Sequence, residues 1–461
     1  MGITRRDLLR GVAVGSAGLV LGACGSNGAP AGGDDGPEVD AGEPRPIAPP
    51  ESTPVVDRFP LGISAGDLHG DRVVVWTRHA GTAPLAAFAW RVEGDTYLEE
   101  LGPFTATPAA EGFTHVPITG LRPGARYRYA FFELVGETRS GRSIIGKFRA
   151  PIADDALETL TFGALSCTDK GRSTDPIWRA AEEDNLDAFL FLGDNAYCES
   201  TDLAGYRKDY QDHYGRDAHI ALRASTGHYI TWDDHELANN VNPENIPPAQ
   251  LEAAFACFFE HSPYLRDTAH PNRFWRSARW GRTLEVFVLD TRSERKPSTR
   301  TTANAEYLSS AQLAWLEAGL AASPCVFKVI MNSVPITNMP TVWDVAPADR
   351  WEGYAAQRTR ILSFIDSQQI KGVAWVAGDF HLAFISKVSS SGAGAMQREI
   401  LVGPGGQTAN PLWTTLNGPQ FQYRTGTNNF TKLMFDPATR AITVTYTNGG
   451  GEAFHTELVT L

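Results

Sequence analysis

The sequence predicts a two-domain protein in which a small β-sandwich precedes a larger α/β domain. Two patterns favour this fold class. Between residues 55 and 152, short alternating strands are separated by closely spaced turn signals, as in a sandwich. From residue 153 to residue 461, short apolar runs alternate with helical patterns, which is typical of α/β folds. The chain of 461 residues is also too long for one compact core.

The sandwich is predicted from four strand patterns, at residues 72–77, 87–92, 113–118 and 121–131. The last of these begins with Leu-x-Pro-Gly-x-x-Tyr-x-Tyr, which resembles the corner of fibronectin type III domains. We therefore expect a fibronectin type III-like β-sandwich over residues 55–152. It carries no obvious catalytic group, so its expected role is packing.

The α/β domain is predicted from helical spacing and from apolar strands. Asp175 followed by Pro176 suits a helix start, with the acid as N-cap. Apolar residues at helical spacing predict further helices over residues 310–322 and 354–368. The apolar runs show no alternation, so they predict strands covered on both faces. These runs are residues 160–165, 188–192, 229–232, 284–289, 326–331 and 373–377.

Residues 1–24 are read as a targeting segment. The pair Arg5-Arg6 precedes an apolar stretch, residues 11–23, that is too short to span a bilayer, and this order resembles a twin-arginine export signal. The stretch ends in Leu-Gly-Ala-Cys24, which resembles a lipoprotein cleavage box, with Cys24 as the lipidated residue. A plain N-terminal anchor with an incidental cysteine is the alternative. Residues 25–54 are Gly-, Pro- and acid-rich, which predicts a disordered linker.

These features predict a protein exported by the twin-arginine route to the periplasm or cell surface, and held at the membrane only by a lipid tether. The formal net charge of −12 repels nucleic acid and anionic lipid, so we expect no specific nucleic-acid binding. A phosphate-binding site would need a local source of positive charge, which metal ions can supply. We expect a monomer.

Four further cysteines follow the targeting segment: Cys167, Cys198, Cys257 and Cys325. An oxidising compartment permits disulfides, but the spacings match no disulfide framework or zinc pattern. Three pairings therefore remain open, and one cysteine can instead be a metal ligand.

The strongest functional signal is that all six apolar runs end in polar groups. In layered α/β folds, ligands bind at the carboxyl ends of the strands, and burying acids there is costly unless cations compensate. A single Asp after a strand is usually a cap or turn residue, but six such ends together predict a metal site. The groups are Ser166-Cys167-Thr-Asp169, Gly193-Asp194-Asn-Ala-Tyr197, Asp233-Asp234-His235-Glu236, Asp290-Thr-Arg292, Asn332, and Gly378-Asp379-Phe-His381.

These motifs, in this order, resemble the calcineurin-like metallophosphoesterases. More narrowly, Trp232-Asp-Asp-His-Glu236, Asp290-Thr-Arg292 and the single ligand candidate Cys167 resemble the PhoD-like alkaline phosphatases and phosphodiesterases. The resemblance covers roughly residues 57–455. It implies a four-layer α/β/β/α metallophosphoesterase domain over residues 153–461.

The resemblance also implies two metal ions. Cys167, Asp194, Tyr197 and His381 would hold one, and thiolate with phenolate suits ferric iron, Fe(3+). Asp194 would bridge to a second ion held by Asp234, Asn332 and Asp379. Those donors are all oxygens, if Asn332 presents its carbonyl, which suits Ca(2+), with Mg or Mn as alternatives.

The implied reaction is attack in line on phosphorus by a hydroxide that the two metals generate. His235 would assist the leaving group, with packing as its alternative role. Arg292 would hold phosphate oxygens through its planar fork, with a structural salt bridge as the alternative. Glu236 is expected to orient a neighbour.

The sequence thus predicts an exported metal-dependent hydrolase of phosphomonoesters, phosphodiesters or both, acting at alkaline pH on a phosphate ester substrate. Two alternatives remain: a phospholipase D-like phosphodiesterase, and a non-catalytic cell-surface binding protein that uses calcium structurally.

Overall fold

The computed structural model describes residues 47–343 and 349–461. The predicted targeting segment with Cys24, and most of the predicted linker over residues 25–54, lie outside the described residues. Among the helices of the described ranges, none is long and apolar enough to cross a bilayer.

The N-terminal strands form two sheets that enclose an apolar core. In chain order they are β1 (Ile63–His69), β2 (Arg72–Arg78), β3 (Leu85–Glu93), β4 (Thr96–Ala106), β5 (Phe113–Ile118), β6 (Arg126–Val135), β7 (Thr138–Arg142) and β8 (Gly146–Arg149). One sheet has the order β4-β3-β6-β7, with β8 on β6, and the other contains β1, β2 and β5. Alternate residues such as Val73 and Val75 of β2 and Tyr127 and Tyr129 of β6 are buried in one apolar cluster. The likeness to fibronectin type III domains stays a prediction.

The sheet of β1, β2 and β5 continues into the α/β region. β1 pairs in parallel with β11 (His228–Thr231), with Gly66 opposite His228. The larger sheet therefore has the order β22-β21-β20-β9-β10-β11-β1-β2-β5, with β18 paired to β9. Half of the sandwich is thus an extension of the large sheet, because the pairing of β1 with β11 joins strands from the two sides of the predicted domain boundary.

The remaining strands of the large sheet are β9 (Leu160–Thr168), β10 (Ala188–Leu192), β18 (Pro404–Gly406), β20 (Asn429–Asp436), β21 (Ala441–Asn448) and β22 (Ala453–Thr460). A second sheet has the order β12-β13-β14-β15-β17-β16-β19. Its strands are β12 (Arg276–Trp280), β13 (Leu284–Val288), β14 (Phe327–Met331), β15 (Val373–Ala377), β16 (Ala383–Lys387), β17 (Arg398–Leu401) and β19 (Phe421–Thr425).

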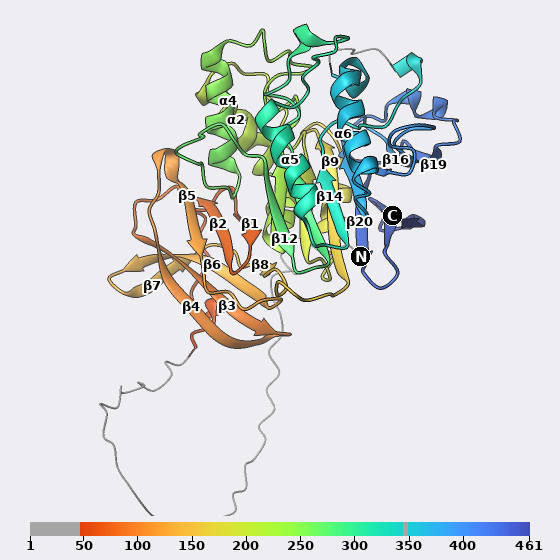
Figure 1. Ribbon diagram of the computed structural model, residues 1–461. Coiled ribbons are helices and arrows are strands. Elements are labelled where there is room, and N and C mark those ends of the chain that lie inside the picture. The colour runs from red at the N-terminus through yellow and green to blue at the C-terminus, as the bar shows by residue number, and fades with distance from the viewer. Residues whose placement is uncertain (1–46, 344–348) are drawn as a thin grey trace, which may run out of the picture. The chain divides into compact units, whose positions relative to one another are not determined.

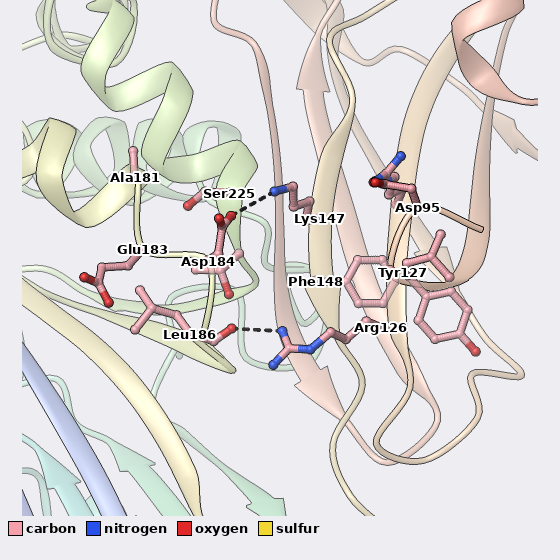
Figure 2. A pocket seen from close by; sticks show the side chains of 14 residues that line it. Asp95, Arg126, Tyr127, Lys147, Phe148, Ala181, Glu183, Asp184, Leu186 and Ser225 are labelled. Atoms are coloured by element: carbon pink, nitrogen blue, oxygen red, sulfur yellow. Dashed lines mark hydrogen bonds and ion pairs between the residues drawn. The ribbon is translucent and has the colours of Figure 1, made fainter. Parts of the chain in front are cut away.

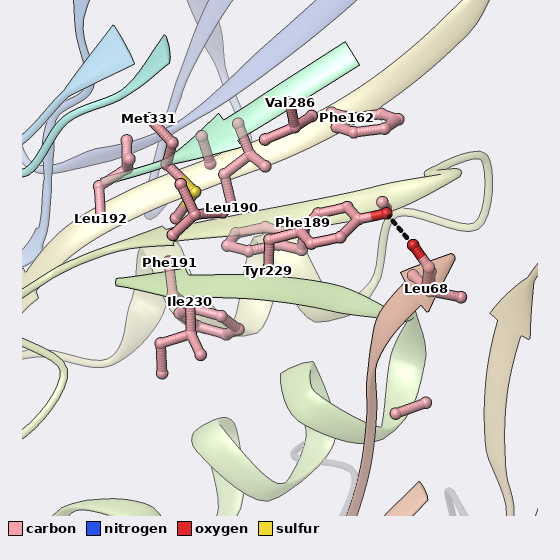
Figure 3. Close-up of a cluster of buried hydrophobic side chains, with 14 of the residues drawn as sticks. Leu68, Phe162, Phe189, Leu190, Phe191, Leu192, Tyr229, Ile230, Val286 and Met331 are labelled. Atoms are coloured by element: carbon pink, nitrogen blue, oxygen red, sulfur yellow. Dashed lines mark hydrogen bonds between the residues drawn. The ribbon is translucent and has the colours of Figure 1, made fainter. Parts of the chain in front are cut away.

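These two sheets pack face to face through large aromatic side chains. The ring of Phe162 on β9 lies 5.3 Å from that of Trp280 on β12, and Phe327 on β14 lies 5.4 Å from Phe435 on β20. Figure 3 shows side chains from both sheets in this apolar layer, among them Phe162, Val286 and Met331. Such a core holds the strand ends of both sheets in fixed relative positions.

Helices cover the outer faces of both sheets (Figure 1). Helices α5 (Ser310–Ala322) and α6 (Ala355–Ser367) pack on the second sheet, where Leu313, Leu316 and Ile361 share a cluster with Phe287 and Trp375. Helices α1 (Asp175–Ala181) and α3 (Asp217–Ser225) contact strands of the large sheet. Helices α2 (Leu203–Tyr214) and α4 (Pro248–His261) pack on each other. The prediction of a mixed α/β region is confirmed.

Short 3₁₀ helices occupy several connections: Pro50–Ser52, Ala110–Gly112, Pro297–Thr299, Thr341–Trp343, Trp351–Tyr354 and Pro411–Thr415. The sequence located α5 within its observed bounds and α6 within one residue at each end. The predicted cap of α1 was off by one position, because Thr174 is the N-cap and Asp175 is already helical.

Candidate metal centre

The polar groups that follow the central strands meet at one edge of the two sheets. β9, β10 and β11 run parallel to one another in the large sheet, and β13, β14 and β15 run parallel in the second. Parallel neighbours end on the same side, so the residues after them are brought together. The convergence that the sequence predicted for these strand ends is therefore observed.

Two groups of ligand types lie at this edge, and both contain Asp194. Ligand atoms of Cys167, Asp194 and His381 lie within 4.8 Å of one another. The same holds for Asp194, Asp233, Asp234 and Asp379. A shared carboxylate between two ligand groups is the geometry of a two-metal site. His235 also lies within 4.8 Å of Asp194 and Asp234, a position that fits a ligand as well as a proton donor.

The thiol candidate Cys167 belongs to the first group, and the phenol candidate Tyr197 lies beside His235. The Sγ of Cys167 lies 3.4 Å from Oδ2 of Asp194, and burial, followed by the charge of Asp194, raises the pKa of this thiol well above its usual value. The Tyr197 ring lies 4.0 Å from the His235 ring, and the Tyr197 hydroxyl accepts a hydrogen bond of 3.1 Å from Gln407. Burial, and then the charge of Asp194, also raises the pKa of Tyr197. Both groups therefore need a cation to ionise here.

The second group contains more negative charge than the protein compensates. Burial raises the pKa of Asp194 and of Asp379 well above the usual range, and neighbouring carboxylates raise both further. Asp349 is a further buried acid at this edge, and the guanidinium groups that face the acids are those of Arg292 and Arg295. Uncompensated buried carboxylates are costly, so this arrangement favours bound cations.

Two oxygens of the predicted second donor set have no hydrogen-bond partner among the described residues. The Asn332 side chain donates its Nδ2 hydrogen to the carbonyl oxygen of Val334, which fixes the amide orientation. Its Oδ1 is buried and has no hydrogen-bond partner among the described residues, and the same is true of Oδ1 of Asp234. Carbonyl and carboxylate oxygens left free in this way fit a hard cation. The predicted donor set is therefore compatible with a metal ion.

The backbone is strained at the same residues. Cys167, Asp194, Asp379 and His381 all have left-handed backbone conformations, with φ of 53°, 53°, 71° and 53°. Such conformations are uncommon for non-glycine residues and cluster at functional sites. Four of them at one predicted site support a binding role for this edge.

The Gly-Asp pairs of the motifs have a steric explanation. A Cβ at Gly193 would lie 2.5 Å from Cβ of Asp233, and one at Gly378 would lie 2.5 Å from Cβ of Ser166. Glycine at both positions therefore lets the strand ends of β10 and β15 approach their neighbours closely. This approach brings Asp194 and Asp379 into one group.

Glu236 holds the loop after β10, as expected of a residue that orients its neighbours. Its carboxylate accepts hydrogen bonds from the backbone N–H groups of Asp194 at 3.1 Å, Asn195 at 2.6 Å and Asp233 at 2.8 Å. Burial raises the pKa of Glu236 to about 7. The carboxylate thus fixes the backbone that carries the shared ligand.

Arg292 lies among the carboxylates of the centre. Its side chain is 1% exposed and grips Asp233 through Nε and Nη2, while Nη1 donates to Asp349 at 2.8 Å. Nη2 also lies 3.4 Å from Asp379. All three nitrogens face carboxylates, and the predicted contact with phosphate stays a prediction. The alternative interpretation, a structural salt bridge, fits the geometry.

Sequence reasoning missed several residues around the centre. Asp349 lies in a loop and follows no buried strand, so the strand-end pattern could not find it. His213 of α2 accepts a hydrogen bond from the backbone N–H of Tyr197 at 3.2 Å through Nε2, but its spacing in the sequence gave no ligand signal. Gln407 follows β18 and could have been found only from the pairing of β18 with β9.

A pocket of about 210 Å³ opens onto the centre. Besides the candidate ligands Asp194, Asp234, Asp379 and His381, its lining includes His235, Asp349, Arg350, the amides of Asn239, Asn240 and Asn410, and the rings of Trp343 and Phe380. This pocket is the route by which a substrate would reach the proposed metal ions.

A larger cavity of about 390 Å³ lies elsewhere, lined by residues of β3, β6 and β8 and by the segment after α1. Figure 2 shows Lys147 turned toward Asp184, at 3.4 Å, and Arg126 donating to the carbonyl oxygen of Leu186. Arg128 pairs with Asp95 at 2.7 Å. The charges that line this cavity are partnered, and none of its lining residues matches a predicted site.

The described cysteines form no disulfide. Cys167, Cys198, Cys257 and Cys325 are all buried free thiols. None of the three open pairings is therefore present, and only Cys167 lies in the candidate metal centre.

The fold and the site together indicate the class of this protein. It is an α/β protein with two face-to-face sheets and a candidate metal site of acids, a thiol and an imidazole at the strand ends. Within this class, the chain belongs to the PhoD-like phosphatase family: the family model matches residues 162–428, and that of the PhoD-like phosphatase N-terminal domain matches residues 46–151.

Individual relatives agree with this assignment. The chain is 28% identical to alkaline phosphatase D of Bacillus subtilis (strain 168) over 388 residues, which is 72% of this chain and 65% of that protein. A solved structure of PhoD aligns with a TM-score of 0.73 at 23% identity, covering 90% of this chain and 94% of that one. A purple acid phosphatase from yellow lupin (Lupinus luteus) seeds aligns with a TM-score of 0.62 at 12% identity, covering 87% and 73%. These two structures support the fold.

Proposed function

We propose that the chain is a metal-dependent hydrolase of phosphomonoesters, phosphodiesters or both. The observation that carries the proposal is the pair of ligand groups that share Asp194 and hold more buried negative charge than their arginines compensate. Membership in the PhoD-like phosphatase family supports it. The matched region spans 65% of the length of alkaline phosphatase D.

We assign Fe(3+) to Cys167, Asp194, Tyr197 and His381, and Ca(2+), or else Mg or Mn, to Asp194, Asp234, Asn332 and Asp379. The thiol and phenol favour iron, and the oxygen-only donor set favours a hard ion. Bound cations would lower the pKa of a coordinated water and offset charge on the phosphoryl oxygens.

The side chains around the ligands have separate roles in this proposal. His235 faces the pocket, and its Nδ1 has no hydrogen-bond partner among the described residues, so it can donate a proton to the leaving group. Glu236 fixes the loop of Asp194 through backbone hydrogen bonds. Arg292 holds Asp233 and Asp349 in place.

The sequence also supports a proposal for where the enzyme acts. We propose export by the twin-arginine route, lipidation at Cys24, and a monomer in the periplasm or at the cell surface. The acidic net charge of −12 supports the absence of specific nucleic-acid binding. The Leu-x-Pro-Gly-x-x-Tyr-x-Tyr stretch supports a fibronectin type III-like sandwich.

One set of assays tests the function and its alternatives. We expect the purified protein to hydrolyse an aryl phosphate or a bis-aryl phosphodiester, to lose turnover with chelator and to regain it with iron and calcium. Preference for a phospholipid over both aryl esters would favour the phospholipase D-like alternative. Absence of turnover with full metal content would leave the calcium-binding alternative, and visible absorbance from an iron–phenolate pair would argue against a calcium-only protein.

A further inference from the structure

The pocket above the metal centre is lined by one arginine that contacts none of the candidate metal ligands in the interactions described above. Arg350 lines the pocket, and it is the one Lys or Arg among the described residues of the lining. Its residue is 5% exposed. Burying a guanidinium beside an opening of about 210 Å³ costs free energy unless partner groups compensate its charge.

Two of the three nitrogens of Arg350 are immobilised. Nε donates to Oε2 of Glu352 at 3.2 Å, and Nη2 pairs with Oε1 of the same carboxylate. Glu352 is itself fixed, because its Oε1 accepts a hydrogen bond of 2.8 Å from the backbone N–H of Met339. The fork is therefore held in one orientation before any ligand binds.

The third nitrogen is free. Nη1 of Arg350 is buried and has no hydrogen-bond partner among residues 47–343 and 349–461. Arg292 offers the contrast, because all of its nitrogens face carboxylates. The aromatic residues of the lining supply no second charge: Trp343 and Phe380 stack at 5.4 Å, and the indole N–H of Trp343 is already bonded to Thr415.

We infer that Arg350 binds the substrate phosphate. It is the one cationic side chain among the described lining residues, and its charge attracts the phosphate oxygens, the role that the sequence had suggested for Arg292. A guanidinium suits this contact because its planar N–H groups match phosphate oxygens and its charge persists at alkaline pH. The inference rests on the proposed function for its substrate, but the contact can be measured without turnover.

The test compares Arg350→Gln with Arg350→Lys and with the wild-type holoenzyme, using inorganic phosphate as the probe. We expect Arg350→Gln to raise the KM for an aryl phosphate and the Ki and calorimetric Kd for inorganic phosphate together, by about 10- to 100-fold. Iron and calcium content should stay at the wild-type level. Arg350→Lys keeps the charge but loses the fork, so we expect a smaller rise in the same constants.

Arg207→Gln is the matched control. Arg207 also grips a glutamate through Nε and Nη2, at 2.7 and 2.5 Å from Glu260, but lies outside this pocket. We expect its phosphate constants to stay within about twofold of wild type. Wild-type constants in a folded, metal-loaded Arg350→Gln protein would overturn the inference. Should that variant not fold, unchanged constants in Arg350→Lys would do the same.

The two proposals fail in different ways. Turnover that persists with unchanged KM and Ki in the Arg350 variants refutes the inference and leaves the function intact. Phosphate binding that depends on Arg350 in a wild-type protein without turnover refutes the hydrolase and supports the inference.

Discussion

Two openings in the described part of the molecule differ in how the charges around them are balanced. The cavity beside β3, β6 and β8 measures about 390 Å³, and its charges form pairs such as Lys147 with Asp184 and Arg128 with Asp95. The pocket at the strand ends measures about 210 Å³. The carboxylates beside it outnumber the arginines that pair with them. Residues with left-handed backbone conformations also cluster at the second opening. Unbalanced charge and strain, rather than volume, identify the candidate active site.

The largest expected effect comes from removing the shared ligand. Asp194→Asn should lower kcat by roughly 10⁴-fold, about 5.5 kcal/mol of transition-state stabilisation, and should lose bound metal. Steady-state kinetics with elemental analysis measures both. Asp184→Asn, in the larger cavity, is the control and should change kcat less than about twofold. Equal effects in the two variants would remove the distinction between the openings.

Arg292→Gln tests the salt-bridge role at the strand ends. Removing the guanidinium leaves Asp233 and Asp349 buried without their partner, so the free energy of unfolding should fall by about 3–5 kcal/mol in urea titrations. Arg126→Gln is the comparison, since Arg126 is 47% exposed in its pair with Asp187 and should cost less than about 1 kcal/mol. A large rise in KM with little change in stability would favour the phosphate role of Arg292.

The variant His235→Asn distinguishes two possible roles of His235, proton donor and metal ligand. As a donor, His235 should contribute about 10²-fold to kcat with a poor leaving group and much less with a nitrophenolate leaving group, with metal content unchanged. The measurement is a series of aryl phosphates that differ in leaving-group pKa. Loss of metal together with a uniform rate decrease would instead make His235 a ligand.

The smallest effect concerns pH and the metal-free protein. Without metal, Asp194 and Asp379 have folded-state pKa values raised by burial, so their contribution to stability is present below the unfolded pKa of about 3.9 and is lost as pH rises through the raised values. The metal-loaded protein should escape this loss, and metal at 100 times its Kd adds about 2.7 kcal/mol. Tm should therefore fall with rising pH in the presence of chelator only. A chelator effect that is independent of pH would contradict the charge argument.

The sequence predicted the strand ends well because they combine two local signals. Runs such as 188–192 and 373–377 are apolar throughout, and each is followed directly by Gly-Asp. The observed strands β10 and β15 have the same bounds. Parallel pairing then converts positions far apart in the chain into one cluster, a step that needs only the α/β pattern.

Other features depend on contacts that no local pattern encodes. Helices α2 and α3 were missed because their buried faces carry residues such as Tyr206, Tyr210 and His219 in place of aliphatic residues. The role of Arg292 depends on Asp349, which lies 57 residues away and was not recognised. Arg350 was missed for the same reason, since its significance comes from the nitrogen that Glu352 leaves free.

The pairing of β1 with β11 also limits how this protein can be dissected. In a fragment that starts near residue 153, β11 would become an exposed edge strand. Its unpaired N–H and C=O groups could then pair with another chain and form oligomers. Grafting a different N-terminal module would face the same difficulty unless the graft supplied a strand to pair with that edge. The two domains are therefore better treated as one unit of expression and engineering.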